Sequence, residues 1–225
     1  MKAVRVNEYG GPEALSYEEV EKPVPGSNEV LVKIAAAGVN YIDTYQRSGL
    51  YQVPLPLTLG LEAAGVVEEL GEGVSKYKKG DRVAYTSVPG AYAEYASVPE
   101  EKLVSLSDGV SFNEGAAAML QGCTAHYLCK STYQVKQGDS CLIHAAAGGV
   151  GLLLIQMVKN AGGFVIGTVS THDKAKLAKE AGADEVILYS EKDLKPKLIG
   201  LHQGTVSMLF MILSANRHLR KASTV

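Results

Sequence analysis

The chain has 225 residues, of which 46% are hydrophobic and 20% charged, and its formal net charge is −2. This composition is typical of a globular protein of one large or two small domains, and the near-neutral charge argues against nucleic acid as a main partner. No apolar run is long enough to span a membrane, and we expect no secretory signal peptide. Three cysteines without metal or redox spacing indicate buried thiols in a reducing cytoplasm.

Short apolar or alternating runs dominate the first 110 residues and predict β-strands. The runs cover residues 1–6, 29–40, 60–70, 81–87 and 91–98. Glycine, proline and charged residues separate them, as turns do. The pattern indicates a small barrel or sandwich-like domain over roughly residues 1–110.

The pattern changes at residue 111, where alanine and leucine begin to recur at helical spacing. Ser111 and Glu114 have the spacing of a capping box at the start of a helix over 111–130. Strands are then expected at 140–145, 164–169 and 185–189, alternating with helices at 152–161 and 174–181. Alternation at this spacing predicts βαβαβ units on a parallel sheet, and therefore an α/β fold.

A glycine-rich turn follows the first of these later strands. Its spacing is Ala146-x-Gly148-x-x-Gly151, a dinucleotide-binding pattern with alanine at the first position. Small residues there allow a sharp turn, let a pyrophosphate lie on bare backbone and bring the next helix close to the sheet. The residues expected to bind the cofactor phosphates are Ala147, Gly148, Gly149, Val150 and Gly151. A purely structural glycine turn is the alternative.

The end of the second strand of the parallel sheet favours NADP over NAD. An NAD enzyme usually places Asp or Glu there to bind the ribose 2′-hydroxyl. This chain instead has the uncharged Ser170 and Thr171, with Lys174 within reach of a 2′-phosphate. Asp173 is expected to face solvent in the first helical turn.

Residues 138–159 form a motif with many defined positions. Its defined positions are Gly138, Asp139, Leu142, Ala146, Ala147, Gly148, Gly149, Gly151, Gln156 and Lys159. The motif resembles the signature of the zeta-crystallin-like quinone oxidoreductases in the medium-chain dehydrogenase/reductase superfamily, and the segments 9–12, 37–45, 60–65 and 120–125 agree. The resemblance implies an N-terminal GroES-like β-rich catalytic domain over 1–115, which is expected to be incomplete. It also implies an incomplete Rossmann domain, a doubly wound parallel sheet that binds NADP, over 116–193.

The resemblance also implies roles for individual residues. The residues expected around the nicotinamide are Asn40, Asp43, Tyr45 and Thr124. Tyr189 is expected near the adenosine phosphate, and Tyr51 along the quinone pocket. The two tyrosines Tyr45 and Tyr51 could equally be half-buried aromatic residues with a hydrogen-bonded tip.

No metal is expected. Zinc-dependent relatives in the superfamily place a cysteine near the position of Asn40 and a histidine at that of Leu61, and neither residue here replaces a thiolate or an imidazole. The cysteine cluster of the structural zinc is also missing. Glu62 is interpreted as structural, and His144, within a buried strand, as non-catalytic.

Residues 194–225 differ from the rest of the chain. They contain five Lys and Arg and no Asp or Glu, whereas residues 1–193 contain 17 Lys and Arg and all 24 acidic residues. The resemblance stops after Asp193. We interpret residues 194–225 as an aberrant tail read out of frame, because a one-base shift permits a Tyr-Asp pair typical of the family near Phe210. The chain would then be truncated.

The favoured function is a zinc-independent oxidoreductase that transfers hydride from NADPH to a quinone or an enone. The alternatives are an NADP-dependent alcohol dehydrogenase, a nucleotide-binding structural protein, and a truncated, inactive or weakly nucleotide-binding fragment. The cofactor carries the difficult chemistry and a quinone takes protons from solvent, so no dedicated catalytic acid is required. The intact family is expected to form homodimers, and no membrane partner is expected.

Overall fold

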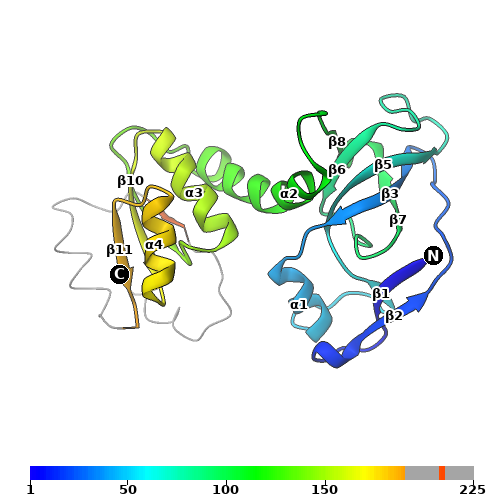
Figure 1. Cartoon of the computed structure of the whole chain (residues 1–225), viewed down its shortest axis with the longest axis horizontal. Coiled ribbons are helices and arrows are strands. Elements are labelled where there is room, and N and C mark those ends of the chain that lie inside the picture. The colour runs from blue at the N-terminus through cyan, green and yellow to red at the C-terminus, as the bar shows by residue number, and fades with distance from the viewer. Residues whose placement is uncertain (191–207, 211–225) are drawn as a thin grey trace. The chain divides into compact units, whose positions relative to one another are not determined.

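A computed structural model of the chain describes residues 1–190 and 208–210. The chain divides into two compact units, Met1–Leu120 and Gln121–Val225 (Figure 1). The boundary between them falls within helix α2 (Phe112–Tyr127), a few residues after the division expected at 115/116. The division into domains of 1–115, 116–193 and 194–225 stays a prediction.

The first unit consists of two antiparallel sheets. The three-stranded sheet has the order β2-β1-β4, formed by Leu15–Glu19, Lys2–Val6 and Leu57–Thr58. The five-stranded sheet has the order β7-β3-β5-β6-β8, formed by Tyr95–Pro99, Glu29–Ala37, Glu62–Leu70, Arg82–Thr86 and Leu103–Ser105. Alternate side chains such as Val30 and Val32 of β3 and Ala96 and Val98 of β7 fill one core, as expected for half-buried strands. This is the β-rich domain that the sequence predicts.

One helix of the first unit, α1 (Tyr41–Ser48), was not predicted. The strand expected to run to Asn40 ends at Ala37, and the backbone N–H of Asn40 donates to the Asp43 carboxylate at the start of the helix (2.8 Å). Gly49 ends it in the left-handed conformation (φ 76°). The short helices η1 (Pro12–Ala14) and η2 (Glu100–Lys102) complete the unit.

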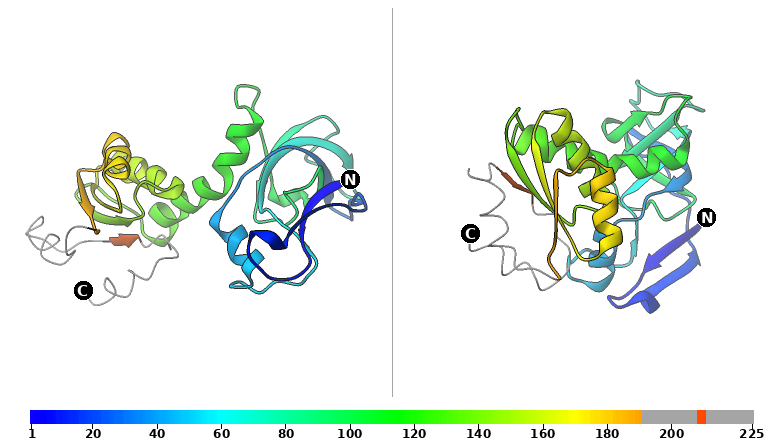
Figure 2. Two further views of the ribbon diagram at one scale, coloured as in Figure 1. Left: turned by 60° about the horizontal axis from the view of Figure 1, so that its bottom comes forward. Right: turned by 60° about the vertical axis from the view of Figure 1, so that its left-hand side comes forward.

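The second unit contains a parallel sheet with strand order β11-β10-β9-β12. Its strands are Glu185–Leu188, Phe164–Val169, Ser140–His144 and Met208–Phe210. The helices α3 (Gly149–Asn160) and α4 (His172–Glu180) lie against the same face of the sheet (Figure 2). After α2, the π-helical segment η3 (Leu128–Thr132) leads toward β9. The predicted βαβαβ order is therefore confirmed.

Several expected boundaries differ from the structure at the helix starts. Helix α3 begins at Gly149 instead of residue 152, because the glycine turn itself forms the first turn of the helix. Helix α4 begins at His172 instead of residue 174, because the Thr171 side chain accepts from the Lys174 N–H and caps it. Asp173 is exposed in that first turn, as predicted.

The cysteines were expected to be buried, which is wrong for one of them. Cys129 and Cys141 are buried, whereas Cys123 is exposed. Burial raises the pKa of the Cys141 thiol to about 12. Cys123 lies on α2, between the buried Ala125 and the partly covered Gly122, where a helix turns one side to solvent.

Residues 194–225 lie outside the described residues except for 208–210. These three residues form β12, which pairs in parallel with β9 and so adds a fourth strand to the sheet. They fall within the apolar run 206–213 of the tail. The out-of-frame origin of the tail stays a prediction.

Candidate active site

The carboxyl end of β9 leads into the predicted phosphate turn. Ala145 adopts a left-handed conformation (φ 52°), and its carbonyl accepts from the Gly148 N–H (2.8 Å). A Cβ on Gly151 would lie 2.5 Å from the Ala145 carbonyl oxygen and 2.7 Å from that of Ala146. Only glycine fits there, and the turn therefore lets helix α3 start directly against the strand end.

The same geometry suits a pyrophosphate. Gly148 caps α3, and Gly149, Val150 and Gly151 form its first turn, in which the backbone N–H groups have no carbonyl partner four residues earlier. These groups and the helix dipole attract anionic oxygens. No carboxylate lies in this first turn. The residues present therefore fit the phosphates of a dinucleotide.

The carboxyl end of β10 brings together the residues expected at the 2′-phosphate. Lys174 Nζ donates to Ser170 Oγ (3.3 Å), and the Lys174 N–H donates to Thr171 Oγ1 (3.3 Å). The backbone of Tyr189, just after β11, donates to the Val169 carbonyl (3.2 Å). The expected residues thus lie at one edge of the sheet, where ligands bind in open α/β sheets.

Two further contacts join the ends of β9 and β10. A hydrogen bond links Nδ1 of His144 to Oγ1 of Thr168 (2.7 Å), and the Thr168 carbonyl accepts from the Ala146 N–H (3.2 Å). Burial lowers the pKa of His144, which favours the neutral ring. The pair ties the phosphate turn to β10, the strand that ends just before Ser170. Sequence reasoning interpreted His144 as non-catalytic and did not identify Thr168 as its partner.

A buried polar network lies at the start of α1 in the first unit. Asn40 Nδ2 donates to Glu62 Oε2 (2.8 Å), and Tyr92 Oη donates to Asp43 Oδ2 (2.6 Å), which also accepts from the Asn40 N–H. The Leu120 N–H donates to the other oxygen of Glu62. Asn40, Asp43 and Glu62 are 8%, 4% and 1% exposed. Residues from four separate segments thus meet in one network.

Burial governs the acid–base behaviour of this network. It raises the pKa of Glu62, the nearby Asp43 carboxylate raises it further, and the hydrogen bond from Asn40 opposes the shift. Burial, followed by the hydrogen bond to Asp43, raises the pKa of Tyr92 well above its usual range. The Tyr92 hydroxyl is therefore a permanent donor at neutral pH. The bonds of Glu62 to Asn40 and Leu120 support its interpretation as structural.

The two expected pocket tyrosines lie together. The rings of Tyr45 and Tyr51 meet edge to face with centroids 5.4 Å apart, and the Tyr51 N–H donates to the Tyr45 carbonyl (3.1 Å). Tyr45 is half-buried, whereas Tyr51 is 44% exposed. Neither tyrosine is a core residue.

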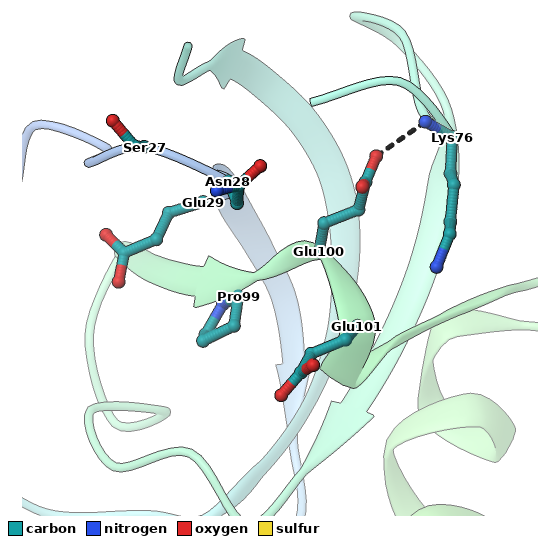
Figure 3. Close-up of a pocket in the computed structure, with 7 residues that line it drawn as sticks. All are labelled: Ser27, Asn28, Glu29, Lys76, Pro99, Glu100 and Glu101. Atoms are coloured by element: carbon teal, nitrogen blue, oxygen red, sulfur yellow. Dashed lines mark hydrogen bonds between the residues drawn. The ribbon is translucent and has the colours of Figure 1, made fainter. Parts of the chain in front are cut away.

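A separate surface hollow of about 410 Å³ lies in the first unit and is lined by none of the expected residues (Figure 3). Ser27, Asn28, Glu29, Lys76, Pro99, Glu100 and Glu101 line it. Glu100 Oε1 accepts from the backbone N–H groups of Ser75 and Lys76, which lowers the pKa of its carboxyl. Glu29 accepts from Gly26 and Ser97. These carboxylates close turns, so the hollow has a structural explanation.

The structure thus places the expected residues in local groups. Asn40 joins Asp43, Tyr45 joins Tyr51, and Ser170 joins Lys174. Thr124 lies on α2 in the second unit. Tyr92 was missed, since a tyrosine in a loop between strands carries no local signal of a contact 49 residues away.

Sequence comparisons identify the two parts of this architecture. Residues 26–108 match the family described as "Alcohol dehydrogenase GroES-like domain", and residues 149–224 match "Zinc-binding dehydrogenase". The second match continues past Asp193, where sequence reasoning ended the resemblance. Among the described residues, no group of three or more His, Cys, Asp or Glu could hold a metal ion. The zinc-free expectation rests on Asn40 and Leu61.

Named relatives narrow the class. A quinone oxidoreductase of Pseudomonas aeruginosa is 48% identical over 205 residues, which cover 90% of this chain and 63% of the relative. The structure of Escherichia coli quinone oxidoreductase complexed with NADPH is 44% identical, with a TM-score of 0.87 over 89% of this chain and 62% of the other. The quinone oxidoreductase of Coxiella burnetii is 33% identical, with a TM-score of 0.87 over 95% of this chain and 69% of the other.

The fold and these matches agree with each other. The chain belongs to the medium-chain dehydrogenase/reductases and, within them, to the quinone oxidoreductase family. It spans about three fifths of the length of the curated relatives it matches. In the described part of the chain, no helix is both long and apolar enough to cross a membrane.

Proposed function

We propose that this chain binds NADPH and serves hydride transfer from it to a quinone or an enone, without zinc. The observation that carries the proposal is the turn at Gly148–Gly151, whose bare backbone opens onto the first turn of α3. The E. coli relative was solved with NADPH, which supports the cofactor. When bound, the nucleotide supplies the hydride.

The chain's own residues would divide the remaining work. The turn and the start of α3 would bind the pyrophosphate, and Lys174 with Ser170 and Thr171 would bind the 2′-phosphate. Tyr189 would lie near the adenosine phosphate. The residues proposed around the nicotinamide are Asn40, Asp43, Tyr45 and Thr124. The exposed ring of Tyr51 would line the pocket of a flat, apolar acceptor.

The proton source, the localisation and the oligomeric state are part of the same proposal. A quinone takes its proton from water, so the absence of a Ser-His or His-Asp dyad among the proposed residues fits this reaction class. We further propose a cytoplasmic enzyme that assembles as a homodimer. Analytical ultracentrifugation tests the assembly, and a monomer at all concentrations would contradict it.

The cofactor is tested by fluorescence titration with NADPH and NADH. Replacing Lys174 with alanine should weaken NADPH binding roughly tenfold or more, the value of a hydrogen bond to a charged group, and leave NADH binding unchanged. Lys176→Ala is the matched control, since Lys176 is an exposed lysine of the same helix that pairs with Glu180. Equal binding of both nucleotides by the unmodified chain would contradict the NADP preference.

The reaction is tested by steady-state oxidation of NADPH with a quinone, with an enone, and in reverse with an alcohol and NADP⁺. We expect turnover with the quinone or the enone. Turnover with the alcohol alone would indicate an alcohol dehydrogenase. Nucleotide binding without turnover would indicate a binding fragment, an outcome that the shorter length of the chain relative to its relatives makes worth measuring.

A further inference from the structure

Gly149 in the phosphate turn is a glycine for a reason that its backbone conformation does not explain. It is the first residue of α3, and its φ does not have the positive value that requires glycine at Gly138 or Gly162. Alanine stabilises a helix more than glycine does, so the backbone alone would favour alanine at this position. The small residue must therefore be required by something that lies beside it.

The side chain of Gln121 occupies the space beside Gly149. A Cβ on Gly149 would overlap Oε1 of Gln121 and would lie 2.5 Å from its Cδ and 3.0 Å from its Nε2. At Gly151, by contrast, the nearest atoms belong to the backbone of Ala145 and Ala146. Gln121 lies on α2 and is the first residue of the second unit, so it belongs to the same unit as the turn. Its carboxamide thus lies against the first turn of α3.

This carboxamide adjoins the part of the turn that is best suited to an anion. The N-cap of α3 is Gly148, which has no side chain to accept from the N–H groups of the first turn, as Ser or Asp does in other helices. The helix dipole adds to the positive potential of these groups. The NH2 group of a glutamine is a further hydrogen-bond donor at this place, and it brings no negative charge.

The carboxamide and the turn are both accessible to a ligand. Gly148 and Gly149 are exposed, and Gln121 and Val150 are partly exposed. A carboxamide has one oxygen that accepts hydrogen bonds and one nitrogen that donates two. Both atoms of the Gln121 carboxamide lie close to the Cβ position of Gly149. The side chain is therefore placed to donate to an anion that the backbone N–H groups of the same turn bind.

We propose that Gln121 is a further cofactor-binding residue, whose Nε2 group donates a hydrogen bond to the pyrophosphate held at the first turn of α3. Gly149 is a glycine because it makes room for this side chain. The proposal rests on the proposed function, since it requires that the turn binds a pyrophosphate. It involves residues of the second unit alone, and it differs from the proposed contact of Lys174, which is with the 2′-phosphate.

The test measures the dissociation constants of NADPH and of adenosine 2′-monophosphate by calorimetry, with the unmodified 225-residue chain and with Gln121→Ala. Loss of a hydrogen bond to a charged group should weaken NADPH binding on the order of tenfold or more. Adenosine 2′-monophosphate has no pyrophosphate, so its binding should not change. Lys174→Ala should give a different pattern and weaken the binding of both ligands.

Gly149→Ala tests the same contact from the opposite side. Its Cβ should displace the Gln121 carboxamide and weaken NADPH about as much as Gln121→Ala does. In the Gln121→Ala background the added methyl group no longer meets this side chain, so it should have no further effect on NADPH binding. The matched controls are Gln156→Ala, an exposed glutamine of α3, and Gly122→Ala, where nothing lies within 4 Å of the Cβ position. Both should leave NADPH binding unchanged.

Three results would overturn the proposal. The first is unchanged NADPH binding by Gln121→Ala. The second is equal weakening of NADPH and adenosine 2′-monophosphate by Gln121→Ala, which would show that the side chain supports the fold of the unit and not the pyrophosphate. The third is an effect of Gly149→Ala that persists in full in the Gln121→Ala background. If the unmodified chain does not bind NADPH, the proposed function fails and this proposal fails with it, whereas the first three results leave the proposed function standing.

Discussion

The candidate binding turn of the second unit and the buried polar network of the first unit are built in opposite ways. In the second unit, the phosphate turn comes from residues 145–151, which are consecutive in the chain and act mainly through bare backbone. In the first unit, the carboxylate network joins Asn40, Glu62, Tyr92 and Leu120, which lie on different elements and act through buried side chains. The phosphate turn depends on free space around its backbone, and the carboxylate network depends on its hydrogen-bond partners.

This difference determines how substitutions should destabilise the turn and the network. Added volume in the turn meets backbone atoms that cannot move, so the helix and strand must separate. A changed polar atom in the network leaves a buried donor or acceptor unpaired, at a cost set by desolvation. Substitutions that separate these two mechanisms test the comparison, and the expected effects below run from the largest to the smallest.

Replacing Gly151 with valine should destabilise the second unit by about 3 kcal/mol and abolish measurable NADPH binding, because the new Cβ meets the carbonyl oxygens of Ala145 and Ala146. Chemical denaturation and nucleotide titration measure both effects. Gly122→Ala is the control within the same unit, since nothing lies within 4 Å of its Cβ position on α2, and it should be neutral or stabilising by up to about 1 kcal/mol. Unchanged NADPH binding by the valine variant would refute the steric account.

Replacing Glu62 with glutamine should destabilise the first unit by about 2 kcal/mol near pH 4, because an amide nitrogen would oppose one of the two donors from Asn40 and Leu120. The pKa of Glu62 is raised above its ordinary value of 4.5, so the folded state binds its proton more tightly than the unfolded state. The stability of the unmodified chain should therefore fall relative to the variant as the pH rises through the raised pKa.

Urea denaturation of both forms at pH 4 and pH 8 measures the free energy of unfolding. The difference between the unmodified chain and Glu62→Gln should be smaller at pH 8 than at pH 4. Exposed Glu101→Gln serves as the control and should show no pH-dependent difference. If the difference between Glu62→Gln and the unmodified chain widens with pH instead, the carboxyl is stabilised as an anion and the account given for its burial is wrong.

Replacing Thr168 with valine should cost about 1 kcal/mol in the second unit, since it removes the hydrogen bond to His144 and preserves volume. Thermal unfolding followed by circular dichroism measures the loss. Thr86→Val is the matched control, because the buried hydroxyl of Thr86 has no hydrogen-bond partner among the described residues. Equal effects of the two substitutions would show that the link between β9 and β10 contributes nothing.

Replacing Cys123 with serine should change stability by less than about 0.5 kcal/mol, as expected for an exposed residue. In the native unmodified chain, Ellman's reagent should titrate one thiol quickly, since burial raises the pKa of Cys129 and Cys141 and limits access to them. The serine variant should show no fast thiol. Rapid reaction of a second cysteine would indicate that the buried core opens readily.

The sequence by itself determined the parts of this protein that are local. Strand β10 occupies the predicted residues 164–169, and the turn at Gly148–Gly151 lies where its spacing predicts, because backbone geometry and hydrophobic periodicity depend on neighbouring residues. Helix α1 escaped prediction for the same reason. Four of its eight residues are aromatic or β-branched, and its stability comes from its caps at Asn40, Asp43 and Gly49.

Only the tertiary structure decided the polar network. Nothing in the spacing of Asn40, Glu62 and Tyr92 shows that they meet, since their contacts depend on the antiparallel pairing of β3 with β5 and on the loop before β7. The sequence likewise could not show that Cys123 is exposed while Cys129 is buried, because burial depends on what packs against each face of α2 and the segment that follows it. Long-range contacts are therefore what brought Asp43 and Glu62, through Asn40, into one buried network.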